Sequence, residues 1–286
     1  MKKFDIVVIG SGAGLMVIEA AVTMGLKCAI IEKSKFGGTC LTKGCIPSKM
    51  LVYPADLIRE TEKSDRVGVQ FKKPHVDWNV ISKRMWKQIN YSLSIEKNLK
   101  KIENLQVYNG TAEFTGKNTL RVRLPEGDYS EEIQGDIIVI AGGARSFVPP
   151  IKNIEDAGYI TYETFFGDKY PKKPWKSLLI VGGGVIGAEF AHIFSAFGTK
   201  VTVLERNDRI LSTEEQEISA FVEREFKNVG ISVITNIDIL DSGKNGTMKP
   251  LTVQDRTTGK VHIFEAEEIF IASGLRSSGD TLHLEN

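Results

Sequence analysis

The chain lacks the features that would point to a membrane or a nucleic acid as its partner. Its formal net charge is +1 over 286 residues, which gives no electrostatic reason to expect nucleic acid or an anionic membrane. No apolar run approaches the roughly 20 residues that a bilayer span requires. Met1-Lys2-Lys3 leads directly into an apolar run instead of a signal peptide with a cleavage site. We therefore expect a cytoplasmic protein with no membrane or nucleic-acid partner.

Cysteine and histidine are also scarce, with three cysteines and four histidines in the chain. Cys28 lies among Ala29, Ile30 and Ile31 and is expected to be a small buried hydrophobe. The histidines are expected at surface or packing positions, and no metal site is expected. They are His75, His192, His262 and His283. The remaining composition, 42% hydrophobic and 26% charged, is ordinary and argues against disorder, and the length suggests two domains.

The other two cysteines, Cys40 and Cys45, stand five positions apart. Thiol-disulfide exchange needs such a pair, because one sulfur attacks while its partner resolves the mixed disulfide. Side chains meet at three and four residues apart in a regular helix, so this spacing needs a distorted turn, which Gly44 and Pro47 could allow. In the cytosol a dithiol is more often catalytic than structural. The spacing predicts redox chemistry, and the alternative is two ordinary buried cysteines.

A dinucleotide fingerprint stands at the N-terminus. Residues 4–9 are typical of a buried parallel strand that runs directly into a glycine-rich turn. Gly10 permits the tight turn, and Gly12 lets the backbone approach a pyrophosphate. The pyrophosphate would then rest on the N-terminal end of a helix expected over about residues 13 to 25.

This first fingerprint departs from the G-x-G-x-x-G pattern at its third glycine. The expected position holds Leu15, and Gly14 lies one residue early, so we expect the helix to pack slightly farther from its strand. A second strand, 27–31, ends on Glu32, which is 22 residues after Gly10. A carboxylate that binds the ribose is expected near that offset.

The pattern recurs after a strand predicted at 177–181, this time complete. Gly182, Gly184 and Gly187 fill all three glycine positions, and a helix is expected over about 186 to 197. Two copies of the motif predict two dinucleotide-binding folds in one chain.

The second copy also ends its next strand, 200–204, on an acidic residue. Glu205 stands 23 residues after Gly182. A carboxylate there accepts hydrogen bonds from the adenosine ribose and would repel a 2′-phosphate, which favours NAD over NADP. Arg206 and Arg209 follow closely, and they remain alternative phosphate ligands.

The segments between the two motifs are assigned from periodicity. Residues 51–104 have helical spacing of apolar residues and predict a long helical excursion, in which Trp78 and Trp86 are expected as packing anchors. Short strands are predicted at 105–108, 111–114, 120–122 and 133–140. A helix is expected over 212–229, with Ser212 or Thr213 as its cap, and further strands to Ile271.

The run from Gly37 to Lys49 closely resembles the active-site signature of the FAD-dependent pyridine nucleotide-disulfide oxidoreductases, and is most similar to that of the dihydrolipoamide dehydrogenases. Residues 141–150 and 272–276 resemble the joints where the family's chain leaves and re-enters the flavin domain. The resemblance implies an α/β fold of two Rossmann-like three-layer domains, with the NAD domain inserted in the FAD domain. The implied FAD-binding domain is 1–145, the NAD-binding domain 146–271, and 272–286 begins the return.

The resemblance also implies roles for particular residues. Cys40 would be the interchange thiol that meets the substrate, and Cys45 the thiol near the flavin. Lys49 would lie beside the flavin N5 edge and pair with Glu189, so that its positive charge stabilises developing negative charge. Outside this family, Glu189 would be an ordinary polar residue on a helix face. The implied cofactor-binding positions for FAD and NAD are Gly10, Gly12, Gly14, Glu32, Gly38, Thr39, Lys49, Ala112, Ala141, Gly142, Gly182, Gly184, Gly187, Glu205 and Gly274.

Two parts of the family pattern have no counterpart in the sequence. No segment after Arg276 offers the apolar strand and Gly-Asp pair that contact the flavin, and none of the four histidines matches the family's C-terminal acid-base histidine. The C-terminal interface domain that builds the family's homodimer is likewise unmatched. We expect a fragment of a longer protein, or else a degraded gene product.

The expected activity is electron transfer from reduced lipoamide to the Cys40-Cys45 disulfide, then to FAD and to NAD. The partner would be a small-molecule dithiol or a lipoyl-bearing protein, with a homodimer for the full-length family. Mercuric reductases and low-molecular-weight disulfide reductases, such as those acting on mycothiol or glutathione, share the signature and remain alternatives. A chain that binds nucleotide without turnover is an alternative of another class.

Overall fold

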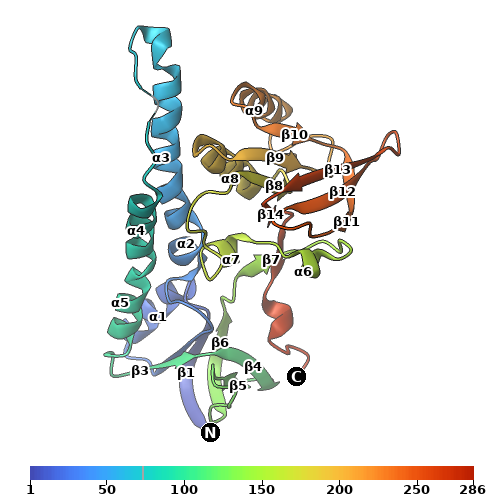
Figure 1. The fold of residues 1–286 in the computed structure, drawn as a ribbon. Coiled ribbons are helices and arrows are strands. Elements are labelled where there is room, and N and C mark those ends of the chain that lie inside the picture. Colours follow the sequence, from blue (N-terminus) through green and yellow to red (C-terminus); the bar gives the residue numbers. More distant parts are fainter. Residues whose placement is uncertain (73) are drawn as a thin grey trace. The chain divides into compact units, whose positions relative to one another are not determined.

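The protein is described by a computed structural model that covers residues 1–72 and 74–286 (Figure 1). Lys73, inside the expected helical excursion, lies outside the described residues. The chain divides into two compact units. The first unit comprises Met1–Pro47, Met85–Arg145 and Arg276–Asn286, and the second comprises Ser48–Arg84 and Ser146–Leu275. No helix in the described part of the chain is both long and apolar enough to cross a membrane.

The first unit is built on a six-stranded sheet in the order β3-β2-β1-β6-β5-β4. The first four strands of this order are parallel, and β5 and β4 continue the sheet antiparallel. Their bounds are β1 Lys2–Ile9, β2 Cys28–Glu32, β3 Leu105–Asn109, β4 Thr111–Gly116, β5 Thr119–Arg123 and β6 Ile133–Ile140.

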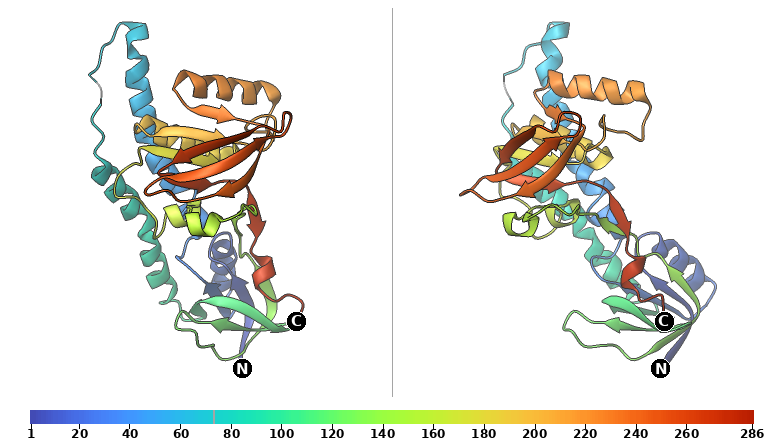
Figure 2. Two further views of the ribbon diagram at one scale, coloured as in Figure 1. Left: turned by 45° about the vertical axis from the view of Figure 1, so that its right-hand side comes forward. Right: turned by 90° about the vertical axis from the view of Figure 1, so that its right-hand side faces the viewer.

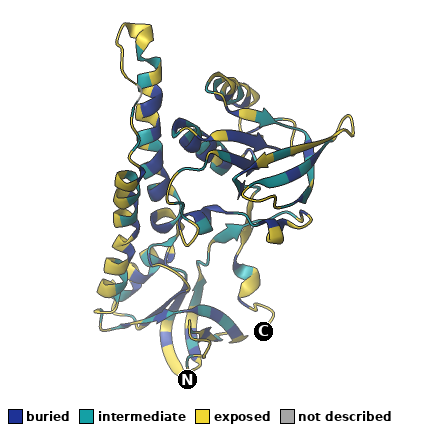
Figure 3. Ribbon diagram, viewed as in Figure 1, coloured by how far each residue is buried: buried dark blue, intermediate teal, exposed yellow. Residues whose placement is uncertain are grey.

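Side chains alternate between the two faces of this sheet, because successive residues of a strand point to opposite sides. Val8 and Ile30 face a cluster with α1 (Gly14–Thr23) and the apolar side of α5 (Tyr91–Leu99). Val7 joins the opposite cluster, which includes Phe114 and Leu120. Both faces of β2 and of the last residues of β1 are therefore buried (Figure 3).

The second unit contains two sheets, and Figure 2 shows them as separate layers in both of its views. A parallel sheet has the order β10-β9-β8-β14, and an antiparallel sheet the order β11-β12-β13. Leu179 and Val181 of the first sheet pack with Leu251 and Val253 of the second. The bounds are β8 Ser177–Val181, β9 Lys200–Leu204, β10 Ser232–Ile234, β11 Ile237–Ser242, β12 Lys249–Asp255, β13 Val261–Ala266 and β14 Glu268–Ile271.

Residues 48–84 belong to this second unit by their contacts, whereas the sequence placed them with residues 1–145. They hold most of α3 (Cys45–Lys63), the 3-10 turn η1 (Ser64–Val67) and the start of α4 (Trp78–Ile89). Ala55 and Ile58 of α3 pack with Ala196 and Phe197, at the end of α8 (Val185–Ala196). Burial of this apolar face explains the assignment.

Trp78 and Trp86 are placed differently. The Trp78 ring stacks on Tyr170 with centroids 5.5 Å apart, and its indole N–H donates to the Pro171 carbonyl at 3.0 Å. This confirms Trp78 as a packing anchor. Trp86 is half-buried, and the Lys35 ammonium lies 5.0 Å from the centroid of its ring.

The helix expected over 212–229 is α9, Gln216–Asn228, with Glu215 at its N-cap. The prediction of Ser212 or Thr213 as the cap is wrong. The Arg209 guanidinium donates to the carbonyls of Leu211, Ser212 and Glu214, and so holds the segment before α9 as a loop.

Near Arg145 and Arg276 the chain passes between the units along two short strands. Strand β7 (Ala144–Ser146) pairs with β15 (Leu275–Ser277). In the second unit, β7 leads to two short helices, α6 (Ile154–Ala157) and α7 (Tyr162–Phe165).

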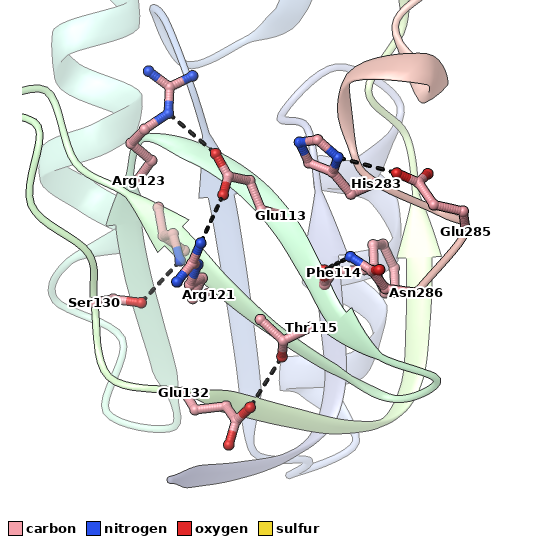
Figure 4. A network of polar contacts seen from close by, with 11 residues as sticks. Glu113, Phe114, Thr115, Arg121, Arg123, Ser130, Glu132, His283, Glu285 and Asn286 are labelled. Carbon is pink, nitrogen blue, oxygen red and sulfur yellow. Dashed lines mark hydrogen bonds and ion pairs between the residues drawn. The ribbon is translucent and has the colours of Figure 1, made fainter.

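The returning chain is fastened within the first unit. The Arg145 guanidinium donates to both oxygens of Asp280, at 2.7 Å each, in the 3-10 turn η2 (Gly279–Thr281). Strand β4 is an edge of the sheet, and the last residues lie along it (Figure 4). The Phe114 N–H donates to the Leu282 carbonyl, and the Asn286 amide donates to the Phe114 carbonyl, both at 2.9 Å. The tail therefore satisfies backbone groups that an edge strand leaves unpaired.

Candidate active site and dinucleotide sites

Cys40 and Cys45 lie on either side of a break between two helices. Cys40 belongs to α2 (Gly38–Thr42), and Cys45 begins α3. The chain leaves the helical path at Lys43, whose φ and ψ are −156° and 14°. A side chain at Gly44 would approach the Thr39 carbonyl oxygen to 3.0 Å, so a residue without a Cβ suits this break. The distorted turn expected from the five-residue spacing is confirmed.

Both cysteines are exposed thiols, and no disulfide joins them in this structure. A hydrogen bond with the Cys45 thiol, reinforced by partial burial, raises the pKa of Cys40 above its ordinary value. The exposure contradicts the alternative of two buried cysteines. Cys28 is buried, and burial with the nearby Asp5 charge raises its pKa, so this thiol is unreactive in the fold.

Lys49 stands one helical turn after Cys45 on α3. Its ammonium donates to Glu189 Oε2 on α8 at 2.6 Å. The Glu189 side chain is 22% exposed, and its other oxygen, Oε1, is buried without a hydrogen-bond partner among the described residues. A buried carboxylate oxygen ordinarily has a donor. Glu189 is thus an acceptor turned toward a group that the described chain does not supply.

In the first fingerprint turn, the backbone of Gly10 and Gly12 lies close to the backbone of two other segments of the chain. Gly10 has φ +103°, and a side chain there would come within 2.2 Å of the Ala141 carbonyl oxygen. Gly38 has φ +66°, and a side chain there would reach Gly12 Cα at 2.4 Å. The turn and the start of α2 therefore meet without side chains between them. Gly142 follows Ala141 in the chain, and Thr39 follows Gly38 in α2, so both stand next to residues of this close approach.

Gly14 replaces the missing third glycine. A side chain at Gly14 would approach Val8 Cγ1 to 2.6 Å, so Gly14 itself lets α1 lie close to β1. The expectation that the helix packs farther from its strand is wrong, because α1 begins at Gly14 and turns that residue, instead of Leu15, toward the sheet. Leu15 packs partly buried in the cluster on that face.

Glu32 ends β2 with its carboxylate buried, 7% exposed. Oε2 accepts hydrogen bonds from the Ser11 N–H at 2.9 Å and the Ser11 hydroxyl at 2.6 Å. Oε1 accepts from the Ser34 N–H and hydroxyl. This places the predicted ribose-binding carboxylate directly against the fingerprint turn.

Four predicted FAD positions, Gly10, Gly12, Gly38 and Ala141, lie close together around the first fingerprint turn. Ala112 lies on β4, with its side chain buried in the core at 2% exposure. The residues of the fingerprint turn fit a dinucleotide pyrophosphate. Glycine backbone lies directly before α1, and the first turn of α1 has no acidic residue. The residues present therefore suit FAD.

A cavity of about 1030 Å³ follows the second fingerprint in the second unit. Gly182, Gly184, Glu205 and Gly274 line it. No atom lies within 4 Å of the position that a side chain would take at Gly184, so the backbone there is open to a ligand. Gly187 sits beneath the turn, where a side chain would meet the Gly182 carbonyl oxygen at 2.0 Å. The first turn of α8 has no acidic residue, and the site suits the pyrophosphate of a nicotinamide dinucleotide.

Glu205 is 8% exposed, and its carboxylate accepts from the Gly183 N–H at 2.6 Å and the Asn207 N–H at 2.7 Å. The two nearby arginines are engaged by other groups. Arg209 donates to the backbone carbonyls before α9. Arg206 Nε donates to Asp238 Oδ1 at 2.9 Å.

Several residues of these sites were missed in the sequence. Ser11 and Ser34 hold Glu32, and Ser11 could have been noticed between Gly10 and Gly12. Asp238 lies on β11, and its second partner, Arg256, lies in the turn between β12 and β13. No local pattern marks them, because they meet Arg206 only through the fold.

Two dinucleotide-type units and an exposed cysteine pair define a class: a dinucleotide-binding protein with redox thiols. The model of the pyridine nucleotide-disulphide oxidoreductase family matches residues 4–286. The chain belongs to this family.

Relatives agree with this assignment. The chain is 32% identical over 293 residues to the dihydrolipoyl dehydrogenase of Bacillus subtilis, with 99% of the chain and 61% of that protein covered. It is 30% identical over 291 residues to the mycothione reductase of Mycobacterium tuberculosis, with 100% and 60% covered. The chain thus spans about 60% of the length of these two relatives.

A solved structure gives the same result. The Cu(II) complex of the HOCl-induced flavoprotein disulfide reductase RclA from Escherichia coli matches with a TM-score of 0.85 at 30% identity. The match covers 100% of this chain and 60% of that one. The chain is therefore an oxidoreductase-family protein of the FAD-dependent type.

Proposed function

We propose that the chain carries the dithiol, flavin and nicotinamide sites of an enzyme that oxidises a dithiol, with dihydrolipoamide as its substrate and NAD as its final acceptor. The observation that carries the proposal is the contact of the exposed Cys40 and Cys45 thiols across the α2–α3 break. The chain spans only part of the length of its relatives, so catalytic turnover is proposed for the whole protein and not for this chain alone.

The thiol chemistry begins with the oxidised pair. A substrate thiolate attacks Cys40 Sγ, the Cys40–Cys45 bond breaks, and Cys45 leaves as a thiolate. The second substrate thiolate then attacks the substrate sulfur of the mixed disulfide and releases Cys40. The substrate becomes a disulfide and the protein pair becomes a dithiol, so two electrons have moved. When bound, FAD takes these electrons from the dithiol and delivers them to the nicotinamide.

Lys49 and Glu189 would stabilise charge during this transfer. The Lys49 ammonium places a fixed positive charge one helical turn from Cys45, where a thiolate develops. Glu189 holds that ammonium at 2.6 Å, and its unpartnered Oε1 offers an acceptor for an amide donor of a ligand. These are the family roles carried to the matching residues.

Glu205 supports NAD over NADP. Its buried carboxylate lies against the second fingerprint turn, where it would accept hydrogen bonds from the ribose and repel a 2′-phosphate. Arg206 and Arg209 are both occupied by groups of this chain. A cytosolic location and a homodimer complete the proposal, because a dithiol in the cytosol is more often catalytic than structural and because the resemblance implies a homodimer for the full-length family.

The relatives act in several enzyme classes and so do not determine the substrate of this protein. Besides dihydrolipoyl dehydrogenases they include the M. tuberculosis mycothione reductase and the mercuric reductase of Bacillus cereus, which is 28% identical over 284 residues. The signature that contains Cys40 and Cys45 is, by the family resemblance, common to these alternatives. We choose dihydrolipoamide because the run Cys40 to Lys49 is most similar to that branch.

The test is a half-reaction on the oxidised protein. Stoichiometric dihydrolipoamide under nitrogen should convert the Cys40-Cys45 disulfide to two thiols, counted by alkylation and mass spectrometry. The Cys40→Ser variant should form no substrate disulfide, whereas Cys28→Ser should behave as the parent. Exchange that survives Cys40→Ser would refute the assignment of Cys40. Faster reduction by mycothiol would replace dihydrolipoamide as the substrate.

A further inference from the structure

One carboxylate joins two arginines beside the second dinucleotide cavity. Asp238 Oδ1 accepts from Arg206 Nε at 2.9 Å, and Asp238 Oδ2 lies 3.4 Å from Arg256 Nε. The two oxygens of one side chain therefore face two separate guanidinium groups. A phosphate group is held by arginines in a similar fork-like way.

This cluster stands at the part of the cavity that Glu205 marks. Arg206 follows Glu205 in the chain, and Glu205, Arg206 and Asp238 all line the cavity. Arg256 is tied to the same point, because its Nη1 donates to the Arg206 carbonyl oxygen at 3.3 Å. The Arg206 side chain is thus placed where a group attached to the ribose would meet it, and Arg256 is held next to it through Asp238 and the Arg206 carbonyl.

We infer that Asp238 is a specificity-determining residue: its carboxylate occupies the place between Arg206 and Arg256 that a ribose 2′-phosphate would need, and so excludes NADP. The inference rests on the proposed nicotinamide dinucleotide site. Asp238 is thus a second carboxylate that acts in addition to Glu205. It lies on another sheet, and it pairs with the two arginines that could otherwise bind an anion.

The charges of the cluster support this assignment. Arg206 and Arg256 supply two positive charges, and Glu205 and Asp238 supply two negative ones, so the group offers a 2′-phosphate no net attraction. Replacing Asp238 with asparagine leaves a net positive charge and removes the carboxylate that pairs with both guanidinium groups. Because Arg206 and Asp238 are 73% and 42% exposed, water and salt weaken each interaction. The expected gain for a 2′-phosphate is therefore about tenfold in affinity rather than many orders of magnitude.

The experiment measures nucleotide binding by isothermal titration calorimetry, with NAD⁺, NADP⁺, 5′-AMP and 2′-AMP as probes. Asp238→Asn should tighten NADP⁺ and 2′-AMP about tenfold at low salt and change NAD⁺ and 5′-AMP less than about twofold. Adding Arg206→Ala to Asp238→Asn should remove the gain. Asp241→Asn is the matched control, because Asp241 lies on the same strand and pairs instead with Lys152 at 3.8 Å.

The outcomes separate the inference from the proposed function. A parent protein that binds NAD⁺ but shows no change in the NADP⁺ to NAD⁺ ratio on Asp238→Asn overturns the inference alone. A parent that prefers NADP⁺ also overturns it, because the arginines would then already be available. A folded parent that binds neither dinucleotide refutes the nicotinamide site, and the inference falls with it.

Discussion

At the residue scale, the reactivity of the thiol pair is set by the contact between its two sulfurs. The hydrogen bond with Cys45 raises the pKa of Cys40, because this contact stabilises the protonated thiol of Cys40 relative to its thiolate. A raised pKa lowers the thiolate fraction at neutral pH, and the thiolate is the nucleophile. Reduced Cys40 is therefore a slow nucleophile unless a base removes its proton.

Alkylation measures this directly. We predict that iodoacetamide modifies Cys40 slowly at pH 7 and faster as pH rises toward the raised pKa. Replacing Cys45 with alanine removes the largest cause of the shift, so the pKa of Cys40 falls and its alkylation rate at pH 7 rises measurably. Peptide mapping across pH 6 to 10 gives the rates. An unchanged pH profile in Cys45→Ala would show that the Cys45 contact does not control Cys40.

Glu32 is a second residue whose partners define its role. Four donors from Ser11 and Ser34 converge on its buried carboxylate. Glu32→Gln places an amide among these donors and should lower the free energy of unfolding by about 1–3 kcal/mol. Urea denaturation is the measurement, and Glu19→Gln, on the exposed side of α1, should cost less than about 0.5 kcal/mol. Equal losses for the two variants would contradict the account of Glu32.

At the element scale, an aromatic cluster fixes α7 against α8. Phe165 is fully buried, and its ring lies 5.1 Å from the centroid of Phe190 and 5.6 Å from that of Phe194. The perpendicular geometry of both pairs is the favourable edge-to-face arrangement. This cluster holds the helix that carries Glu189 and the open turn at Gly184.

Truncation of Phe165 should therefore destabilise the second unit strongly. Phe165→Ala should cost about 3–5 kcal/mol of unfolding free energy through lost burial and a cavity. Phe221→Ala on α9, where the ring is 52% exposed, should cost about 0.5 kcal/mol. The comparison uses urea midpoints of the two variants. A small loss for Phe165→Ala would mean that the cluster can collapse without cost.

Elements with a strong local signal could be predicted from the sequence. Both fingerprint turns, their helices and the strands ending at Glu32 and Glu205 lie where the glycine spacing placed them. The start of α9 could not be placed from composition, because the Arg209 contacts with three carbonyls override the capping residues. The role of Gly14 was missed for a similar reason, since the phase of α1 on its sheet is set by packing on Val8.

At the scale of the whole molecule, the chain passes between the two units more than once. It enters the second unit after Pro47 and again after Arg145, and it returns to the first unit at Met85 and at Arg276. Arg145 is held by Asp280 within the first unit. The assignment of residues 48–84 could not be predicted, because it depends on the packing of Ala55 and Ile58 against Ala196. Periodicity identifies a helix but not which core it joins.

The Arg206–Asp238–Arg256 cluster belongs to the same scale. Its members come from the loop after β9, from β11 and from the turn after β12, and meet only when two sheets pack together. The sequence left Arg206 and Arg209 as alternative phosphate ligands, and the structure assigns partners to both. If the proposed role of Asp238 is correct, the choice between NAD and NADP depends on the assembled unit as well as on Glu205.

The visible absorption spectrum of the purified 286-residue protein, with FAD added, tests the central claim most directly. The account predicts bound flavin bands, and a long-wavelength band after anaerobic reduction by excess dithiol, because the Cys45 thiolate would lie against the flavin. Cys45→Ser should keep the flavin and lose that band. A folded protein that takes up no FAD, or a band that survives Cys45→Ser, would contradict the account.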